Sequence, residues 1–351
     1  MDSARRRPAR RAARRRPLHQ ARTEDRHDVP RGCASNHSAT LALVSRRRKA
    51  SALAGSFVAA LALPEVAAAN VDKVTASQVS GDWHAPPAVL AAAALAALLF
   101  AQAFVRLRRR GRTDHAPWSR AGLFGAGLAL GVLPLVSPLD AAGDQYLLSA
   151  HMLQHVLVGD AAALLIVLAV RGPLAFFLLP PSILRPLAGW QPLRAFLRTL
   201  LRPRVTFAVW LAVMLGWHVP AAYDYTLTHP VVHDLEHAMF VLVGTLVWIQ
   251  LIDPAHHAGL TRGGRIAFAF GMLVFGHPIS DTLIFSPTPV YHPYAAQPHR
   301  LLGIGVMSDQ RLAGLVMVVE QLLTLGTFIA VMLWPLLRSR AARPVGLQRP
   351  A

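Results

Sequence analysis

Seven apolar segments of about 20 residues each occupy most of this chain, and they constrain its fold more than any other feature. A helix needs about 20 apolar residues to cross the hydrocarbon core of a bilayer. Only 15% of the 351 residues are charged, whereas about a quarter are charged in an average soluble domain. We therefore expect an all-α, polytopic membrane protein, a bundle of seven transmembrane helices. The expected spans are approximately 87–105, 120–138, 147–170, 205–222, 232–252, 266–286 and 311–337.

Arginine is unevenly distributed among the connecting loops, and this predicts the orientation of the bundle. The loop after the first segment and the 171–204 loop each contain six arginines, while PLDAAGDQY and AAYDYTLTHPVV contain none. Because Lys and Arg collect in cytoplasmic loops, the first span is expected to start outside and the C-terminus to be cytoplasmic. The 171–204 loop is expected to lie along the cytoplasmic interface, because its frequent prolines would break a spanning helix.

The chain ahead of the expected spans has a different composition. Residues 1–45 are rich in Arg, Pro and Ala, which predicts a disordered arm or translated upstream sequence. Residues 46–69 combine a basic start, an apolar stretch and a small-residue ending, which is typical of a secretory signal peptide. A weak N-terminal anchor is the alternative. We expect residues 87–337 to form the seven-helix membrane domain and residues 338–351 to form a cytoplasmic tail.

Positive charge is concentrated in the N-terminal arm. The formal net charge is +18, and residues 1–49 contain 15 of the 36 Lys and Arg residues but only 4 of the 18 Asp and Glu residues. No aromatic residue lies among these arginines, so the stacking platform that binds single-stranded nucleic acid is missing. We therefore expect membrane lipid, and no nucleic acid, as a partner of this chain.

Histidines lie within the apolar segments, where a titratable side chain is costly and indicates a functional site. Two i,i+4 pairs, in HMLQH and HDLEH, each place two imidazoles on one helical face. The predicted orientation puts histidines from four helices in the outer half of the membrane. Neutral imidazole is a common ligand of transition metals. The candidate metal ligands are His151, His155, His218, His233, His237 and His277.

The residue types available restrict the chemistry of such a site. The only cysteine is Cys33, in the arm, so the chain has no copper-thiolate motif and no intramolecular disulfide. Methionines such as Met152 and Met317 offer soft thioethers that suit Cu(I), although packing is the simpler role for each one. Copper is the expected cofactor. Acidic residues in or beside the spans could orient imidazoles or balance the charge of an ion; they are Asp160, Glu236, Asp281 and Glu320.

Three motifs resemble those of the CtaG-type, or caa3-type, family of cytochrome c oxidase assembly factors. They are HMLQH, WHVPAAYDYTLTHPVVHDLEHAMF and DQRLAGLVM. The resemblance implies a seven-helix protein of the bacterial plasma (inner) membrane with a suspected role in copper delivery. The implied partners are nascent cytochrome c oxidase subunits, with periplasmic copper chaperones as a further partner. The positions that carry over are His151, Gln154, His155, Trp217, His218, Pro220, Tyr223, His233, Glu236, His237, Asp309, Gln310, Gly314 and Met317.

The end of the last of these motifs and the residues after it read VMVVEQ, without the tryptophan and proline of the family form. No family role is therefore carried over to Glu320.

We therefore expect a non-enzymatic assembly factor that holds copper among its outer histidines and passes it to a nascent oxidase. The sequence contains no nucleophile–base constellation and no nucleotide-binding motif. Two alternatives stay open. The first is a haem-binding membrane electron-transfer protein with imidazoles from different helices as axial ligands. The second is a copper or proton transporter, with Asp160 and Asp281 as relay groups within the membrane.

Overall fold

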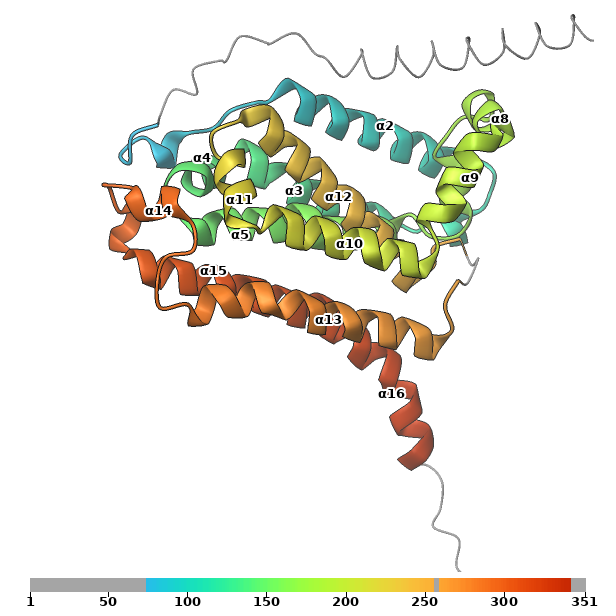
Figure 1. The fold of residues 1–351 in the computed structure, drawn as a ribbon. Coiled ribbons are helices and arrows are strands. Elements are labelled where there is room, and N and C mark those ends of the chain that lie inside the picture. Colours follow the sequence, from blue (N-terminus) through green and yellow to red (C-terminus); the bar gives the residue numbers. More distant parts are fainter. Residues whose placement is uncertain (1–73, 256–258, 342–351) are drawn as a thin grey trace, which may run out of the picture. The chain divides into compact units, whose positions relative to one another are not determined.

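The computed structural model describes residues 74–255 and 259–341, and all regular elements within these residues are helical. The prediction of an all-α protein is confirmed for this part of the chain. The arm predicted over residues 1–45 and the signal or anchor predicted over 46–69 lie outside it, as does most of the predicted tail. The long helices run side by side (Figure 1).

Six candidate membrane spans are present among the described residues, which fits a multi-pass membrane protein. Three of them consist of consecutive helical elements, which are continuous in two cases and are separated by Ala116 and Pro117 in the third. The six spans are α2 (Pro87–Arg109), η2 with α3 (Thr113–His115 and Trp118–Val136), α5–η3–α6 (Leu148–Val156, Leu157–Ala161 and Ala162–Ala169), α12 (Pro230–Ile252), α13 (Arg262–Phe285) and Val306–Pro335. The last of these consists of α15 (Val306–Gln321), η5 (Leu322–Gly326) and α16 (Thr327–Ala341) as far as Pro335.

The fourth expected span, 205–222, is not a single helix. Helix α10 (Pro203–Trp217) has 15 residues, which corresponds to about 22 Å against a hydrocarbon core of about 30 Å. Only together with α9 (Gln191–Leu200), from which it is bent by 74°, is it long enough to count as a seventh span. The apolar run continues past Trp217, but the chain turns there and a new helix starts at Pro220.

The remaining elements are short and connect the spans. They are η1 (Val79–Gly81), α4 (Pro138–Gln145), α7 (Pro173–Phe177), α8 (Pro181–Gly189), α11 (Pro220–Thr226), α14 (His292–Ala296) and η4 (Leu301–Gly303). Many of the helices start with a proline, because the first helical position does not need an N–H donor and suits the fixed φ of proline. In α9, Leu193, Phe196 and Leu200 recur with helical spacing opposite Arg194 and Arg198, a pattern typical of a helix lying in a membrane interface.

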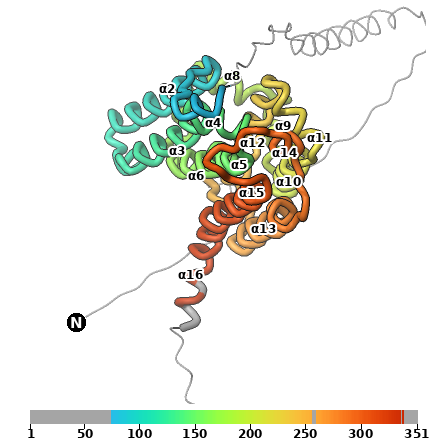
Figure 2. Tube along the Cα trace, turned by 90° about the vertical axis from the view of Figure 1, so that its left-hand side faces the viewer, coloured from blue at the N-terminus to red at the C-terminus, as the bar shows by residue number. Residues whose placement is uncertain are grey.

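The α5–η3–α6 span is the central one. It packs against α3, α4, α12 and α15, and α5 lies between α12 and α15 in Figure 2. Helix α2, by contrast, packs mainly on α3 and α7 and exposes Leu90, Leu95 and Leu98. Exposed leucines are expected on a peripheral span, because lipid tails are as apolar as leucine.

Two glycines let α12 approach the central span closely. A Cβ atom at Gly244 would lie 1.8 Å from the carbonyl oxygen of Gly159, and one at Gly159 would lie 2.9 Å from Cβ of Phe240. Small residues allow such backbone contact between membrane helices. The separation of the central span and α12 therefore depends on glycine at both positions.

The central and last spans each contain a π-helical segment, η3 and η5. A π-helix is hydrogen-bonded from residue i to i+5, and such segments are frequent near functional sites. Residues five apart are about 140° apart around an α-helix, whereas the wider π turn brings them toward one face. His155 and Asp160 are five residues apart across η3, and both line the same cavity.

Candidate metal centre

Four imidazoles meet between α5 and α12. They belong to His151, His155, His233 and His237, which we call the tetrad. One nitrogen from each ring lies within 4.8 Å of the other three, and all four residues are buried. The ring centroids form a four-sided figure with sides of 4.3, 5.0, 4.3 and 5.0 Å and diagonals of 6.2 and 6.5 Å. The two i,i+4 pairs thus face each other between the two helices.

The nitrogen spacing of the tetrad fits a single metal ion. Nε2 of His151 lies 2.9 Å from Nε2 of His155 and 3.3 Å from Nε2 of His233. A tetrahedral ion with metal–nitrogen bonds of about 2.0–2.1 Å holds its nitrogen ligands about 3.3–3.4 Å apart. Imidazole donors suit copper, zinc, iron and nickel, so the geometry alone does not select the metal.

Tyr294, from α14, sets the orientation of the His151 ring. Its hydroxyl donates to the carbonyl oxygen of Gly143 at 2.7 Å and lies 2.8 Å from Nδ1 of His151. Since that hydroxyl proton is already used, its oxygen accepts from Nδ1–H of His151. Nε2 of His151 is then left unprotonated and faces the other imidazoles. A hydrogen bond to the non-ligating nitrogen is the usual way in which proteins orient a metal-binding histidine.

Asp144, from α4, is the nearest carboxylate to the tetrad. Its two oxygens lie 3.8 Å from Nδ1 of His151 and 3.6 Å from Nδ1 of His233. Desolvation and the nearby Asp234 raise the pKa of Asp144 to about 7. A carboxylate in this place can balance part of the charge of a bound cation. Neither Asp144 nor Tyr294 was predicted, and the only sequence signal was an acidic residue in an arginine-free loop on the expected side of the histidines.

The other two candidate ligands, His218 and His277, lie apart from the tetrad. Nδ1 of each is hydrogen-bonded to the carbonyl oxygen four residues earlier, at 2.7 Å for Met214 and 2.9 Å for Leu273. Since a carbonyl only accepts, Nδ1 carries the proton in both rings. His218 lines a cavity together with His155. His277 belongs neither to the tetrad nor to the lining of that cavity.

The acidic residues have separate environments. Glu236 is fully buried, and Thr226 is a polar neighbour of its carboxyl group. Asp160 accepts a hydrogen bond from Nε1 of Trp248 at 2.7 Å and also interacts with Glu320. Asp281 is exposed on α13. The expected role of Asp160 and Asp281 as a pair of relay groups is therefore not supported, because only Asp160 lines the interior cavity.

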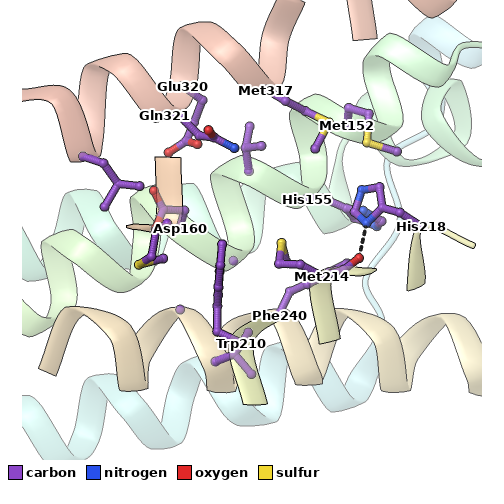
Figure 3. Close-up of a pocket in the computed structure, with 16 residues that line it drawn as sticks. Met152, His155, Asp160, Trp210, Met214, His218, Phe240, Met317, Glu320 and Gln321 are labelled. Carbon is purple, nitrogen blue, oxygen red and sulfur yellow. Dashed lines mark hydrogen bonds between the residues drawn. The ribbon is translucent and has the colours of Figure 1, made fainter. Parts of the chain in front are cut away.

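A cavity of about 80 Å³ adjoins the tetrad on the side of His155. Figure 3 shows its lining, with His155 and His218 near one end and Asp160, Glu320 and Gln321 toward the other. Apolar side chains such as Trp210 and Phe240 form much of the remaining wall. Four methionines also line it: Met152, Met214, Met272 and Met317.

The non-histidine motif residues have packing and hydrogen-bonding roles around the site. Gln154 donates to Asp140 and to the carbonyl of Pro134. The ring of Tyr223 stacks on Tyr291 with a centroid distance of 4.0 Å. The side chain of Gln310 accepts a hydrogen bond from the backbone N–H of Val290. It also donates to the carbonyl oxygens of Leu283 and Thr288. These hydrogen bonds fix the loop that follows α13. A Cβ atom at Gly314 would lie 2.7 Å from the carbonyl of Ser280, so α13 and α15 are in close contact there.

Comparison with known proteins identifies one family. Residues 98–339 match the family described as cytochrome c oxidase caa3 assembly factors. The match covers well over half of the chain, including the tetrad, the cavity and all the candidate spans apart from the start of α2. No curated protein and no solved structure matches the chain.

Proposed function

This chain belongs to the cytochrome c oxidase caa3 assembly factors, and we propose that it holds copper at the tetrad and passes it to a nascent oxidase subunit. The convergence of four buried imidazole nitrogens within 4.8 Å is the observation that carries this proposal. Membership of an assembly-factor family implies contact with oxidase components and indicates a non-catalytic role. Copper is an ion that such an oxidase requires and that imidazole nitrogen binds well.

The tetrad lies near the ends of two spans, which suits an ion that must be transferred. His151 is three residues from the start of α5, and His237 is seven residues from the start of α12. At 1.5 Å per residue, these positions are about 5 and 10 Å from the helix ends. We propose that these ends face the periplasm of a bacterial inner membrane, in agreement with the arginine-rich loops on the opposite side. A periplasmic copper chaperone is then the expected source of the ion.

The ring arrangement disfavours the haem alternative at the tetrad. A haem with two axial histidines needs a flat macrocycle between two opposed rings. In the tetrad, any two rings taken as axial ligands have the other two imidazoles beside them, at centroid distances of 4.3–6.5 Å. Those two rings occupy the space that the macrocycle requires. An optical spectrum of the purified protein is expected to lack a Soret band.

Metal analysis with matched histidine variants tests the proposal. The purified full-length protein is loaded with Cu(I), exchanged into metal-free buffer and analysed for copper, while host membranes carrying the same variants are assayed for oxidase activity. His237→Ala is expected to lose the tetrad copper and to lower oxidase activity. His277→Ala, which removes a span histidine outside the tetrad, is expected to match the wild type in both. Wild-type copper content and wild-type oxidase activity in His237→Ala would contradict the proposal.

A further inference from the structure

The cavity beside the tetrad is lined by soft donor atoms. Met152 and Met317 are buried in one apolar cluster, and Met214 packs against it. The three thioethers line the same cavity as His155 and His218 (Figure 3). Thioether sulfur is a preferred donor for Cu(I). Packing alone can explain a buried methionine. It does not explain why the imidazole of His218, in the same cavity, has a ring nitrogen without a hydrogen-bond partner among the described residues.

His218 supplies that nitrogen. Its Nδ1–H donates to the carbonyl oxygen of Met214, so in the neutral ring Nε2 holds a lone pair and no proton. Nε2 is buried and has no hydrogen-bond partner among the described residues. A buried acceptor left without a partner costs about 1–3 kcal/mol unless a ligand or water satisfies it. This nitrogen is therefore suited to bind an ion or a donor inside the cavity.

The far end of the cavity is lined by two acidic residues, Asp160 and Glu320. Their carboxyl groups interact with each other, and Asp160 also accepts a hydrogen bond from Nε1 of Trp248. Oε1 of Glu320 and Oε1 of Gln321 are buried and have no hydrogen-bond partner in the part of the chain that the structure describes. None of the described residues that line the cavity is Lys or Arg. A negative charge on either carboxyl group would be costly there without a counter-charge, so acidic groups in this cavity favour a cation as its ligand.

The size of the cavity restricts the ligand. A buried water needs about 10–15 Å³ of cavity volume, so about 80 Å³ accommodates a bare ion with a few waters. The donor types, the acidic groups and the size together point to a small, soft cation.

We propose that this cavity is a second Cu(I) site, separate from the tetrad, formed by Nε2 of His218 and the thioethers of Met152, Met214 and Met317. The identity of the ion as copper rests on the proposed function. The choice of ligand residues rests only on the lining of the cavity. His155 borders both sites, so the ligands of the two sites are contiguous and an ion can pass between them without entering lipid.

Copper stoichiometry and copper X-ray absorption on the purified full-length protein test this proposal. Cu(I) is titrated against a competing chromophoric chelator, and the coordinating atoms are identified from the absorption fine structure. The cavity variant is the double substitution Met152→Leu with Met317→Leu, which conserves side-chain volume. Met239→Leu is its control, because Met239 lies on α12 outside the cavity lining. His233→Ala removes a tetrad ligand that does not line the cavity. Size-exclusion elution confirms that each variant is folded.

The wild type is expected to bind two Cu(I) ions and to show sulfur as well as nitrogen ligands. The double methionine variant is expected to bind one ion with nitrogen ligands alone, whereas Met239→Leu binds two. His233→Ala is expected to retain one ion with sulfur ligands. A wild type that binds one ion through nitrogen alone overturns the cavity site and leaves the tetrad intact. A wild type that binds no Cu(I) overturns the proposed function, and loss of both ions in the folded methionine variant overturns the separation of the two sites.

Discussion

One carboxylate oxygen of Asp309 accepts hydrogen bonds from both the backbone N–H and the hydroxyl of Ser149, at 3.0 and 2.5 Å. The two residues are 160 positions apart in the sequence. The other oxygen of Asp309 accepts from the N–H of Leu148 at 2.7 Å. Because the first N–H groups of a helix have no partner within the helix, α15 supplies the N-terminal cap of α5. The last span thereby holds the first turn of the helix that carries His151 and His155.

Replacement of this cap is expected to destabilise the protein. Asp309→Ala removes three charge-assisted hydrogen bonds and leaves buried donors without a partner, which corresponds to a loss of about 1.5–3 kcal/mol of unfolding free energy. Thermal unfolding in detergent measures the effect. Asp114→Ala, at an exposed acidic residue, is the control and is expected to cost less than about 0.5 kcal/mol. Equal unfolding temperatures for the two variants would contradict the capping role.

Alanine substitutions at two glycines, one in close backbone contact and one in open space, are expected to have opposite effects on stability. Gly244→Ala places a methyl group against a backbone carbonyl that cannot move aside, and overpacking of this kind costs about 1–3 kcal/mol or more. Gly216→Ala, in α10, has open space around the new Cβ and is expected to stabilise the helix by up to about 1 kcal/mol. Unfolding temperatures give the comparison. Because His233 and His237 are on the same helix as Gly244, copper binding by Gly244→Ala is also expected to weaken.

The hydroxyl of Tyr294 is expected to matter for metal affinity through His151. Tyr294→Phe removes the acceptor for Nδ1–H of His151, and the loss of such a partner typically lowers metal affinity about 10- to 100-fold. Competition with a Cu(I) chelator measures this change. Tyr225→Phe is the matched control, because Tyr225 is exposed and stacks on His229 away from the tetrad. If the two variants bind Cu(I) equally well, Tyr294 does not position His151.

Asp140 is expected to make stability depend on pH. Burial and the neighbouring Asp144 raise the pKa of Asp140 to about 6, above its usual value of 3.8. The native state therefore binds a proton more tightly than the unfolded chain, so this stabilisation is complete below about pH 4 and is lost as the pH rises through 6.

Asp140→Asn keeps an acceptor for Gln154, which donates to Asp140, but it does not titrate. Between pH 4.5 and 7, wild-type stability is expected to fall by about 1–2 kcal/mol more than that of the variant. Unfolding temperatures measured across this range test the difference, with Asp114→Asn as the exposed control. Parallel pH profiles for the wild type and Asp140→Asn would show that Asp140 is not the group responsible.

Hydropathy predicted the helical class and most of the candidate spans, because lipid requires long apolar helices regardless of the details of packing. It failed at 205–222, where the side chains stay apolar beyond Trp217 although the helix ends there. The two π-helical segments were also not predictable. A single extra residue in a helical turn does not change the hydropathy of a segment, so only the backbone reveals it.

The tetrad was largely predictable from the sequence, whereas the positions of the other two histidines relative to it were not. An i,i+4 spacing places both members of a pair on one face whatever the packing, so each pair could be recognised in the sequence. Whether His218 or His277 joins them depends on the rotation of α10 and α13 about their axes. That rotation depends on contacts between residues that are far apart in the sequence, such as Phe207 with Gly271 and Gln321 with Gly276. Asp144 and Tyr294 reach the site from the short connecting helices α4 and α14, for which no local pattern predicts a direction.

Because of the π-helical segment η3, the function of the central span depends on its number of residues as well as on their types. His155 and Asp160 line one cavity only because the chain between them contains one residue more than an α-helical turn needs. Deleting any single residue there would leave every histidine, methionine and carboxylate in the protein. It would nevertheless turn α6, from Ala162 onward, by about 100° relative to α5. A relative could therefore keep the whole set of ligands and still lose the connection between the two sites, through a change in length that a comparison of residue types does not detect.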